Sequence, residues 1–190
     1  MNRCTIEQVA YVFFGEADRV KLNLDGGVRV IIPSDFKPKL TPDQYYVEDS
    51  ISIRRLERVK SGDILISLVG DIGSSMVADD IIAGSVLGRG CAALRLREDA
   101  QIVTNDWIKA WVLSTDFKEQ VSEWVVGDVL SRLPGSALRG FSLPEPSPHD
   151  LVKLESLNGP LAKTERELHH VLRLIRDLRK IENELLFCRG

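Results

Sequence analysis

The side chains best suited to chemistry with a ligand are basic, and their densest group outside the C-terminal region lies in the first third of the chain. It comprises Arg54, Arg55, Arg58 and Lys60. Lysine and arginine at this density form either a solvated surface or contacts to nucleic-acid phosphates, which position a protein without reading sequence. The residues alone leave both interpretations open.

A second polar segment, residues 131–140, is rich in glycine, serine and arginine. Pro134 and Gly135 interrupt regular structure there, so we expect a loop. Arginine pairs bidentately with the edge of guanine, and serine donates or accepts a hydrogen bond. The segment is therefore a candidate for contacts to base edges or phosphates, and Arg89, between two glycines, is a candidate of the same kind. The side chains that this loop would present are Arg132, Ser136 and Arg139.

No catalytic or metal-binding constellation can be recognised. The three histidines have no cysteine or carboxylate at a recurring metal spacing, and the serines have no His–Asp partner that the sequence identifies. The Asn/Asp-Pro-Pro-Tyr/Phe motif of adenine methyltransferases is absent. Residues 70–75 lack the Lys-Ser/Thr of a P-loop and the third glycine of a dinucleotide fingerprint, so we expect a tight turn between strands. We expect no cofactor, no metal and no catalysis by this chain.

Composition limits the class of protein. The chain has 190 residues, 44% of them hydrophobic, which suffices for one globular core with an appended element. The net charge of −3 counts against a lone non-specific nucleic-acid binder, but not against a subunit that reads base edges beside a more basic partner. The sequence shows no membrane-length apolar run and no signal-like N-terminus, and three widely spaced cysteines suit a reducing compartment, so a cytoplasmic protein is expected.

Hydrophobic patterns predict a strand-rich first part followed by helices. Strands are expected at residues 28–32, 51–53, 64–69, 76–77, 81–82 and 91–97. Amphipathic helices are expected at 105–113, capped by Asn105 and Asp106, and at 117–125. Residues 33–50 and 131–140 are expected as loops, and 143–148 as a stiff proline-rich linker.

From residue 150 onward the pattern is helical, with a break expected at residues 158–160. Apolar side chains then recur at heptad spacing and form two seams, as in a coiled coil. An exposed coiled-coil arm and a helix packed on its own domain both agree with this pattern. The seam residues are Leu161, Leu168 and Ile175 in the first seam, and Val171, Leu178 and Leu185 in the second.

Two segments carry a resemblance to a known family. They are residues 61–73 (SGDILISLVGDIG) and residues 134–146 with the leucine-rich helix that follows. Together they resemble the target recognition domain of the specificity (S) subunit of type I restriction-modification systems, over residues 55–187. The resemblance implies an α+β fold. A mixed α/β target recognition domain with a twisted, mostly antiparallel sheet would occupy residues 1–146. A long C-terminal coiled-coil helix, for dimerisation or partner binding, would occupy residues 147–190.

The resemblance also implies a function. In that family, S subunits carry two such domains on long paired helices, and each domain reads half of a split target. Methyltransferase (M) subunits methylate adenine, and restriction or translocase (R) subunits cleave. The chain would then be a non-catalytic, half-length specificity subunit that directs M and R subunits to double-stranded DNA and forms a homodimer through its C-terminal helix. The residues expected to contact DNA are Arg54, Arg55, Arg58, Lys60, Ser74, Arg89, Arg132, Ser136 and Arg139.

Three alternatives stay open from the sequence. The chain could be a coiled-coil assembly protein of a phage-defence complex that does not read DNA, which its acidic charge favours. It could also be the recognition domain of a fused DNA methyltransferase. An enzyme is the third alternative, although no site for one can be named.

Overall fold

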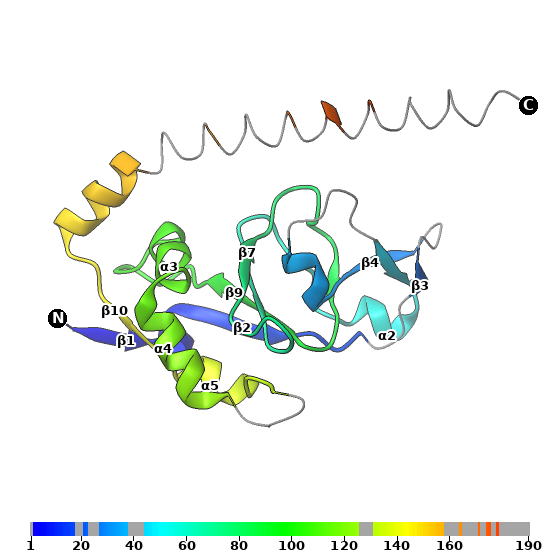
Figure 1. Ribbon diagram of the computed structural model, residues 1–190, viewed down its shortest axis with the longest axis horizontal. Coiled ribbons are helices and arrows are strands. Elements are labelled where there is room, and N and C mark those ends of the chain that lie inside the picture. Colours follow the sequence, from blue (N-terminus) through cyan, green and yellow to red (C-terminus); the bar gives the residue numbers. More distant parts are fainter. Residues whose placement is uncertain are drawn as a thin grey trace, which may run out of the picture. The chain divides into compact units, whose positions relative to one another are not determined.

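The structure, a computed structural model, describes residues 2–17, 21–22, 27–37, 44–125 and 131–157, together with positions 164, 171, 174, 175 and 178. The chain divides into two compact units. Unit 1 comprises Met1–Lys37 and Asp43–Pro146, and unit 2 comprises Pro38–Pro42 and Ser147–Gly190. All the labelled strands and helices belong to unit 1 (Figure 1).

A four-stranded antiparallel sheet runs through unit 1. Its strands lie in the order β2 (Ala10–Phe14), β9 (Cys91–Leu96), β6 (Ile64–Ser67) and β7 (Ser75–Val77). Every residue of β6 is buried, as its near-continuous apolar run predicts for a strand with core on both faces. The tight turn predicted between β6 and β7 is confirmed, with Gly70 and Gly73 at φ 71° and 82°.

One face of this sheet, the face that carries Ile64 and Ile66, packs against helices. Figure 1 shows α3, α4 and α5 gathered on one side of the sheet. Phe117 lies between Trp111 and Phe141 in this layer, in edge-on ring contacts with centroid distances of 4.9 and 5.9 Å. The helices of this layer are α1 (Ile6–Val9), α3 (Asn105–Val112), α4 (Thr115–Trp124) and α5 (Gly135–Gly140).

The opposite face of the sheet carries Leu65 and Ala93 and packs against a second sheet. Ile31 and Leu87 of the second sheet fill the space between the two. The mixed composition and the mostly antiparallel pairing confirm the expected fold class for this unit, with β4–β8 as a parallel pair. The second sheet has the order β3 (Lys21–Leu22), β5 (Tyr45–Val47), β4 (Val28–Ile31) and β8 (Val86–Leu87), and a 3-10 turn, η1 (Pro33–Phe36), follows β4.

A third, two-stranded sheet joins the first and last strands of unit 1. In it β1 (Arg3–Thr5) pairs antiparallel with β10 (Ser142–Pro144). The side-chain amide of Gln120 fastens this sheet to α4, because it donates to the carbonyl of Ser142 and accepts from that residue's N–H, both at 2.8 Å. The expected proline linker at 143–148 therefore begins as a strand.

Asp116, in the first turn of α4, connects the same sheet to the helical layer. Its carboxylate accepts from the Arg3 guanidinium at 2.9 Å and from the Trp111 indole N–H at 2.7 Å. Burial raises the pKa of the Asp116 carboxyl, but the hydrogen bonds from Arg3 and Trp111 outweigh burial, so its pKa lies below the ordinary 3.8.

Two predicted strands are wrong because local side-chain to backbone hydrogen bonds favour turns there. Residues 51–53 lie in a helix, α2 (Ile51–Arg54), whose N-terminus is capped by the Ser50 hydroxyl accepting from the Ile53 N–H. Residues 81–82 lie in a turn, where an Asp79 carboxylate oxygen accepts from the N–H groups of both residues.

Two predicted loops are also corrected. Residues 33–50 contain η1 and β5. Residues 131–140 contain α5, which begins after Pro134 and buries Ala137 and Leu138 in the core. The cap of α3 is Thr104, whose hydroxyl accepts from the N–H of Trp107, and not Asn105 or Asp106.

Unit 2 contains a helix at residues 148–157. Ser147 caps it through a reciprocal pair of hydrogen bonds with Asp150, and Pro148 occupies the first helical position. Val171, Ile175 and Leu178 are helical and exposed. The other seam residues, Leu161, Leu168 and Leu185, lie outside the described residues, so the long coiled coil stays a prediction.

The Asp116 contacts predict an acid-dependent stability. A carboxyl whose pKa is lower in the folded chain stabilises it above the unfolded pKa, and this contribution is lost as the pH falls through the folded pKa. The difference in free energy of unfolding between the wild type and Asp116→Asn should be constant above about pH 5 and shrink below about pH 4. Urea unfolding of both chains from pH 7 to pH 3 measures it. A difference that stays constant to pH 3 would contradict the role of these contacts.

Candidate functional site

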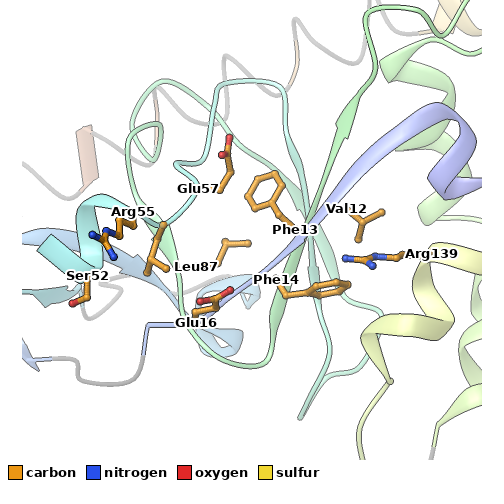
Figure 2. A pocket seen from close by; sticks show the side chains of 10 residues that line it. Val12, Phe13, Phe14, Glu16, Ser52, Arg55, Glu57, Leu87 and Arg139 are labelled. Atoms are coloured by element: carbon orange, nitrogen blue, oxygen red, sulfur yellow. The ribbon is translucent and has the colours of Figure 1, made fainter.

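A pocket of about 500 Å³ opens in unit 1 where the end of β2, α2, β8 and α5 meet (Figure 2). We call it the arginine pocket. It brings together Arg55 and Arg139, which lie far apart in the sequence and were both predicted as ligand contacts. The residues that line it are Val12, Phe13, Phe14, Glu16, Ser52, Arg55, Leu56, Glu57, Leu87 and Arg139.

Phe14, the last residue of β2, positions one wall of the arginine pocket. The guanidinium carbon of Arg139 lies 5.2 Å from the centre of the Phe14 ring, within the range of a cation–π contact. The same ring packs against the start of α5, because a Cβ on Gly135 would lie only 2.6 Å from it. Phe14 thus supports both the helix that carries Arg139 and the Arg139 side chain.

The other aromatic residues of β2 make similar contacts on the opposite face of the strand. The guanidinium carbons of Arg95 and Arg97 lie 4.9 Å and 4.5 Å from the ring centres of Phe13 and Tyr11. Sequence reasoning missed these arginine–aromatic pairs. The available signal was the aromatic run at residues 11–14, whose neighbours could not be named without the fold.

The basic cluster consists of Arg54, Arg55, Arg58 and Lys60. A buried carboxylate fixes the segment that bears it. Asp63 has a side chain only 2% exposed and accepts two hydrogen bonds from Arg95, both 2.8 Å long. It also accepts from the backbone N–H of Lys60 at 2.8 Å. Arg95 in turn donates to the Arg58 carbonyl at 2.7 Å and pairs with the Glu57 carboxylate. The hydrogen bond with Asp63 is the main cause of a raised pKa for Arg95.

Within the basic cluster, the side chains differ in their surroundings. Arg54 pairs with Asp49 at 3.1 Å and is two-thirds exposed. Arg58 donates to the Gly84 carbonyl at 3.2 Å and lies 3.8 Å from the same aspartate. Arg55 lines the arginine pocket, and Lys60 is exposed. The four cations therefore share one segment, but only Arg55 lines the pocket.

The remaining candidates lie at other places in unit 1. Ser74 lines a separate, largely apolar pocket of about 660 Å³ between the β6–β7 turn and helices α3 and α4. Arg132 is exposed and pairs through its backbone with Val69. Ser136, on α5, and Arg89, which follows β8, are exposed. The structure thus brings two of the nine candidates into one pocket, and the other seven do not line it.

Two kinds of site are missing among the residues that the structure describes. They contain no cluster of three or more histidine, cysteine, aspartate or glutamate side chains that could hold a metal ion. In the same residues, no helix has the length and apolar content needed to cross a bilayer.

Comparison with known proteins rests on structure, because no protein-family model and no curated protein matches the sequence. The crystal structure of the type I restriction-modification S subunit from M. genitalium is similar over 96% of this chain, with a TM-score of 0.66 and 16% identity. This chain has the fold of type I S subunits. The HsdS subunit from Thermoanaerobacter tengcongensis is similar over 93% of the chain, with a TM-score of 0.59 and 19% identity.

A third similar structure comes from a study of complex assembly and conformational transition of the type I R-M system, with a TM-score of 0.56 and 19% identity over 93% of the chain. This S-subunit-like chain spans 44%, 43% and 44% of the M. genitalium, T. tengcongensis and third chains. It therefore matches less than half the length of each. The resemblance expected from residues 61–73 and 134–146 is confirmed for the fold.

The buried contact between Asp63 and Arg95 gives a prediction for stability. Asp63→Ala leaves the Arg95 guanidinium without its principal partner in a mostly buried position, so the free energy of unfolding should fall by about 3–5 kcal/mol. Asp99→Ala is the matched control, because Asp99 is 79% exposed in its 3.4 Å pair with Arg97 and should cost less than about 1 kcal/mol. Urea denaturation followed by circular dichroism measures both. Equal effects of the two variants would contradict the structural role of Asp63.

Proposed function

We propose that this chain recognises double-stranded DNA in a sequence-specific way and contacts it through the face that contains the arginine pocket. The observation that carries the proposal is that Arg55 and Arg139 line one pocket on an S-subunit-like fold. Arg139 is held against Phe14, and a stacked guanidinium keeps its N–H groups available for a guanine edge.

The residues of the basic cluster are assigned to two kinds of DNA contact, to phosphates and to base edges. Arg54, Arg58 and Lys60 are exposed or half-exposed on the segment that also carries Arg55, which suits contacts to phosphates. Arg55 and Arg139 are assigned to base edges, and residues 1–146 form the recognition domain in this proposal. The remaining proposed contacts are Ser74, Arg89, Arg132 and Ser136.

The proposed partners follow from the fold. Residues 147–190 would form the dimerisation or partner-binding region. The chain would direct an adenine methyltransferase subunit, and a restriction subunit, to its DNA site in the cytoplasm without catalysis of its own. A second copy of the chain is the proposed source of the other half-site, because the apolar side chains of Val171, Ile175 and Leu178 in unit 2 are exposed. A coiled-coil assembly protein that does not read DNA is the alternative, and the DNA-binding test below separates the two.

Replacing Arg139 tests the assignment of base contacts. Arg139→Ala should cost about 1–3 kcal/mol of binding to the preferred sequence and relax discrimination at one base pair. Arg54→Ala, on the exposed side of the cluster, should instead weaken binding evenly across sequences and reduce the salt slope by about one. Fluorescence anisotropy with preferred and scrambled duplexes at several salt concentrations measures both effects.

The wild-type chain must first show a preference in a selection from random duplexes, with and without an M subunit. If it selects no sequence in either condition, the proposed function is wrong and the assembly-protein alternative stands. If it selects a sequence but neither variant changes binding, DNA contacts another surface.

The exposed seam of unit 2 predicts self-association. Val171, Ile175 and Leu178 are helical and 49%, 39% and 65% exposed, and short helices with such a seam are marginal without a partner. The wild type should sediment as a dimer, and a triple variant with Leu168→Gln, Ile175→Gln and Leu178→Gln should sediment as a folded monomer. Sedimentation velocity with circular dichroism measures this. A wild-type monomer at tens of micromolar would contradict the homodimer.

A further inference from the structure

The arginine pocket has a mixed charge that contacts between its arginines and guanine do not explain. Alongside Arg55 and Arg139 it is lined by the carboxylates of Glu16 and Glu57. A pocket for a phosphate would exclude carboxylates, because they repel the anion. The edges of base pairs, by contrast, present both acceptors and donors in the major groove, so a pocket that holds both cations and carboxylates suits base edges.

The two carboxylates differ in availability. Glu57 forms an ion pair with Arg95, so its carboxylate belongs to the hydrogen-bond network of Asp63 and Arg95. The Glu16 side chain is exposed and forms no hydrogen bond or ion pair with any other residue that the structure describes. In Figure 2 its carboxylate lies between Arg139, on the α5 side, and Arg55, on the α2 side. Glu16 is thus the acceptor that the pocket offers to a ligand.

The backbone around Glu16 is fixed on both sides, which sets where its side chain begins. The N–H of Gly15 donates to the Cys91 carbonyl at 2.9 Å, and the N–H of Ala17 donates to the Leu87 carbonyl at 3.2 Å. Gly15 also lies so close to Gly88 that a Cβ on it would be 1.9 Å from the Gly88 carbonyl oxygen. A side chain on such a rigid support loses less conformational freedom on binding than one on a free loop.

We infer that Glu16 is a specificity-determining residue, which accepts a hydrogen bond from the exocyclic amino group of a cytosine in the major groove. This inference rests on the proposed function. Carboxylates accept from cytosine N4, whereas arginine pairs with guanine, so Glu16 and Arg139 in one pocket suit a G·C base pair or adjacent G and C positions. Glu16 was not among the residues predicted from the sequence.

The test uses the full chain and the DNA site obtained from a random-duplex selection. Glu16→Gln keeps the shape of the side chain but adds an amide donor, and glutamine pairs with adenine N6 and N7. The variant should lose about tenfold in discrimination for cytosine at one position and shift its preference there toward adenine. Glu98→Gln is the matched control, because Glu98 is exposed and does not line the pocket, and it should leave every position unchanged.

A duplex with N4-methylcytosine at the affected position should also bind the wild type less well than one with 5-methylcytosine, which keeps both amino hydrogens. If Glu16→Gln raises affinity equally for all sequences, Glu16 merely repels phosphates and the inference is wrong. An unchanged preference in Glu16→Gln, with a clear preference in the wild type, overturns the inference and leaves the proposed function intact. A wild type that selects no sequence overturns both.

Discussion

The fork of hydrogen bonds between the Asp63 carboxylate and the Arg95 guanidinium is the contact on which the proposed DNA-facing side depends. Asp63 precedes β6, and Arg95 lies near the end of β9, so the pair joins two strands at the middle of the main sheet. It also reaches outward to the Arg58 carbonyl and the Lys60 N–H. A buried charge is tolerated only with its partner. The backbone position of the basic cluster therefore depends on the same hydrogen bonds that join β6 and β9.

Strands with a strong local signal could be predicted from the sequence. Residues 64–66 of β6 and 91–94 of β9 are all apolar, and side chains of both strands lie in the cores on the two faces of the sheet. Predictions from short sequence patterns were wrong where a single side chain determined the local backbone conformation. The alternation at residues 51–53 is too short to separate a strand from a helical turn, and the Ser50 cap selects the helix. The glycine, serine and arginine residues of segment 131–140 suggested a loop, but burial of Leu138 in the core selects a helix.

The candidate site was predictable only in part, for a related reason. Arginine and serine in polar segments indicate ligand contacts by residue type alone, so Arg55 and Arg139 could be predicted as DNA contacts. Their meeting in one pocket depends on long-range packing of α5 against Phe14 and on the parallel pairing of β4 with β8, neither of which has a local sequence signal. Glu16 follows an aromatic run and precedes residues with no distinctive pattern. Its relevance becomes visible only when β8 is known to lie beside it.

The pairing of β1 with β10 places the first strand of unit 1 next to its last strand. Arg3 lies opposite Pro144 and Thr5 opposite Ser142 in this ladder. A unit whose two ends are neighbours can be inserted into another chain, or copied in tandem, without stretching its interior. Two such units in one polypeptide would therefore each keep an intact interior.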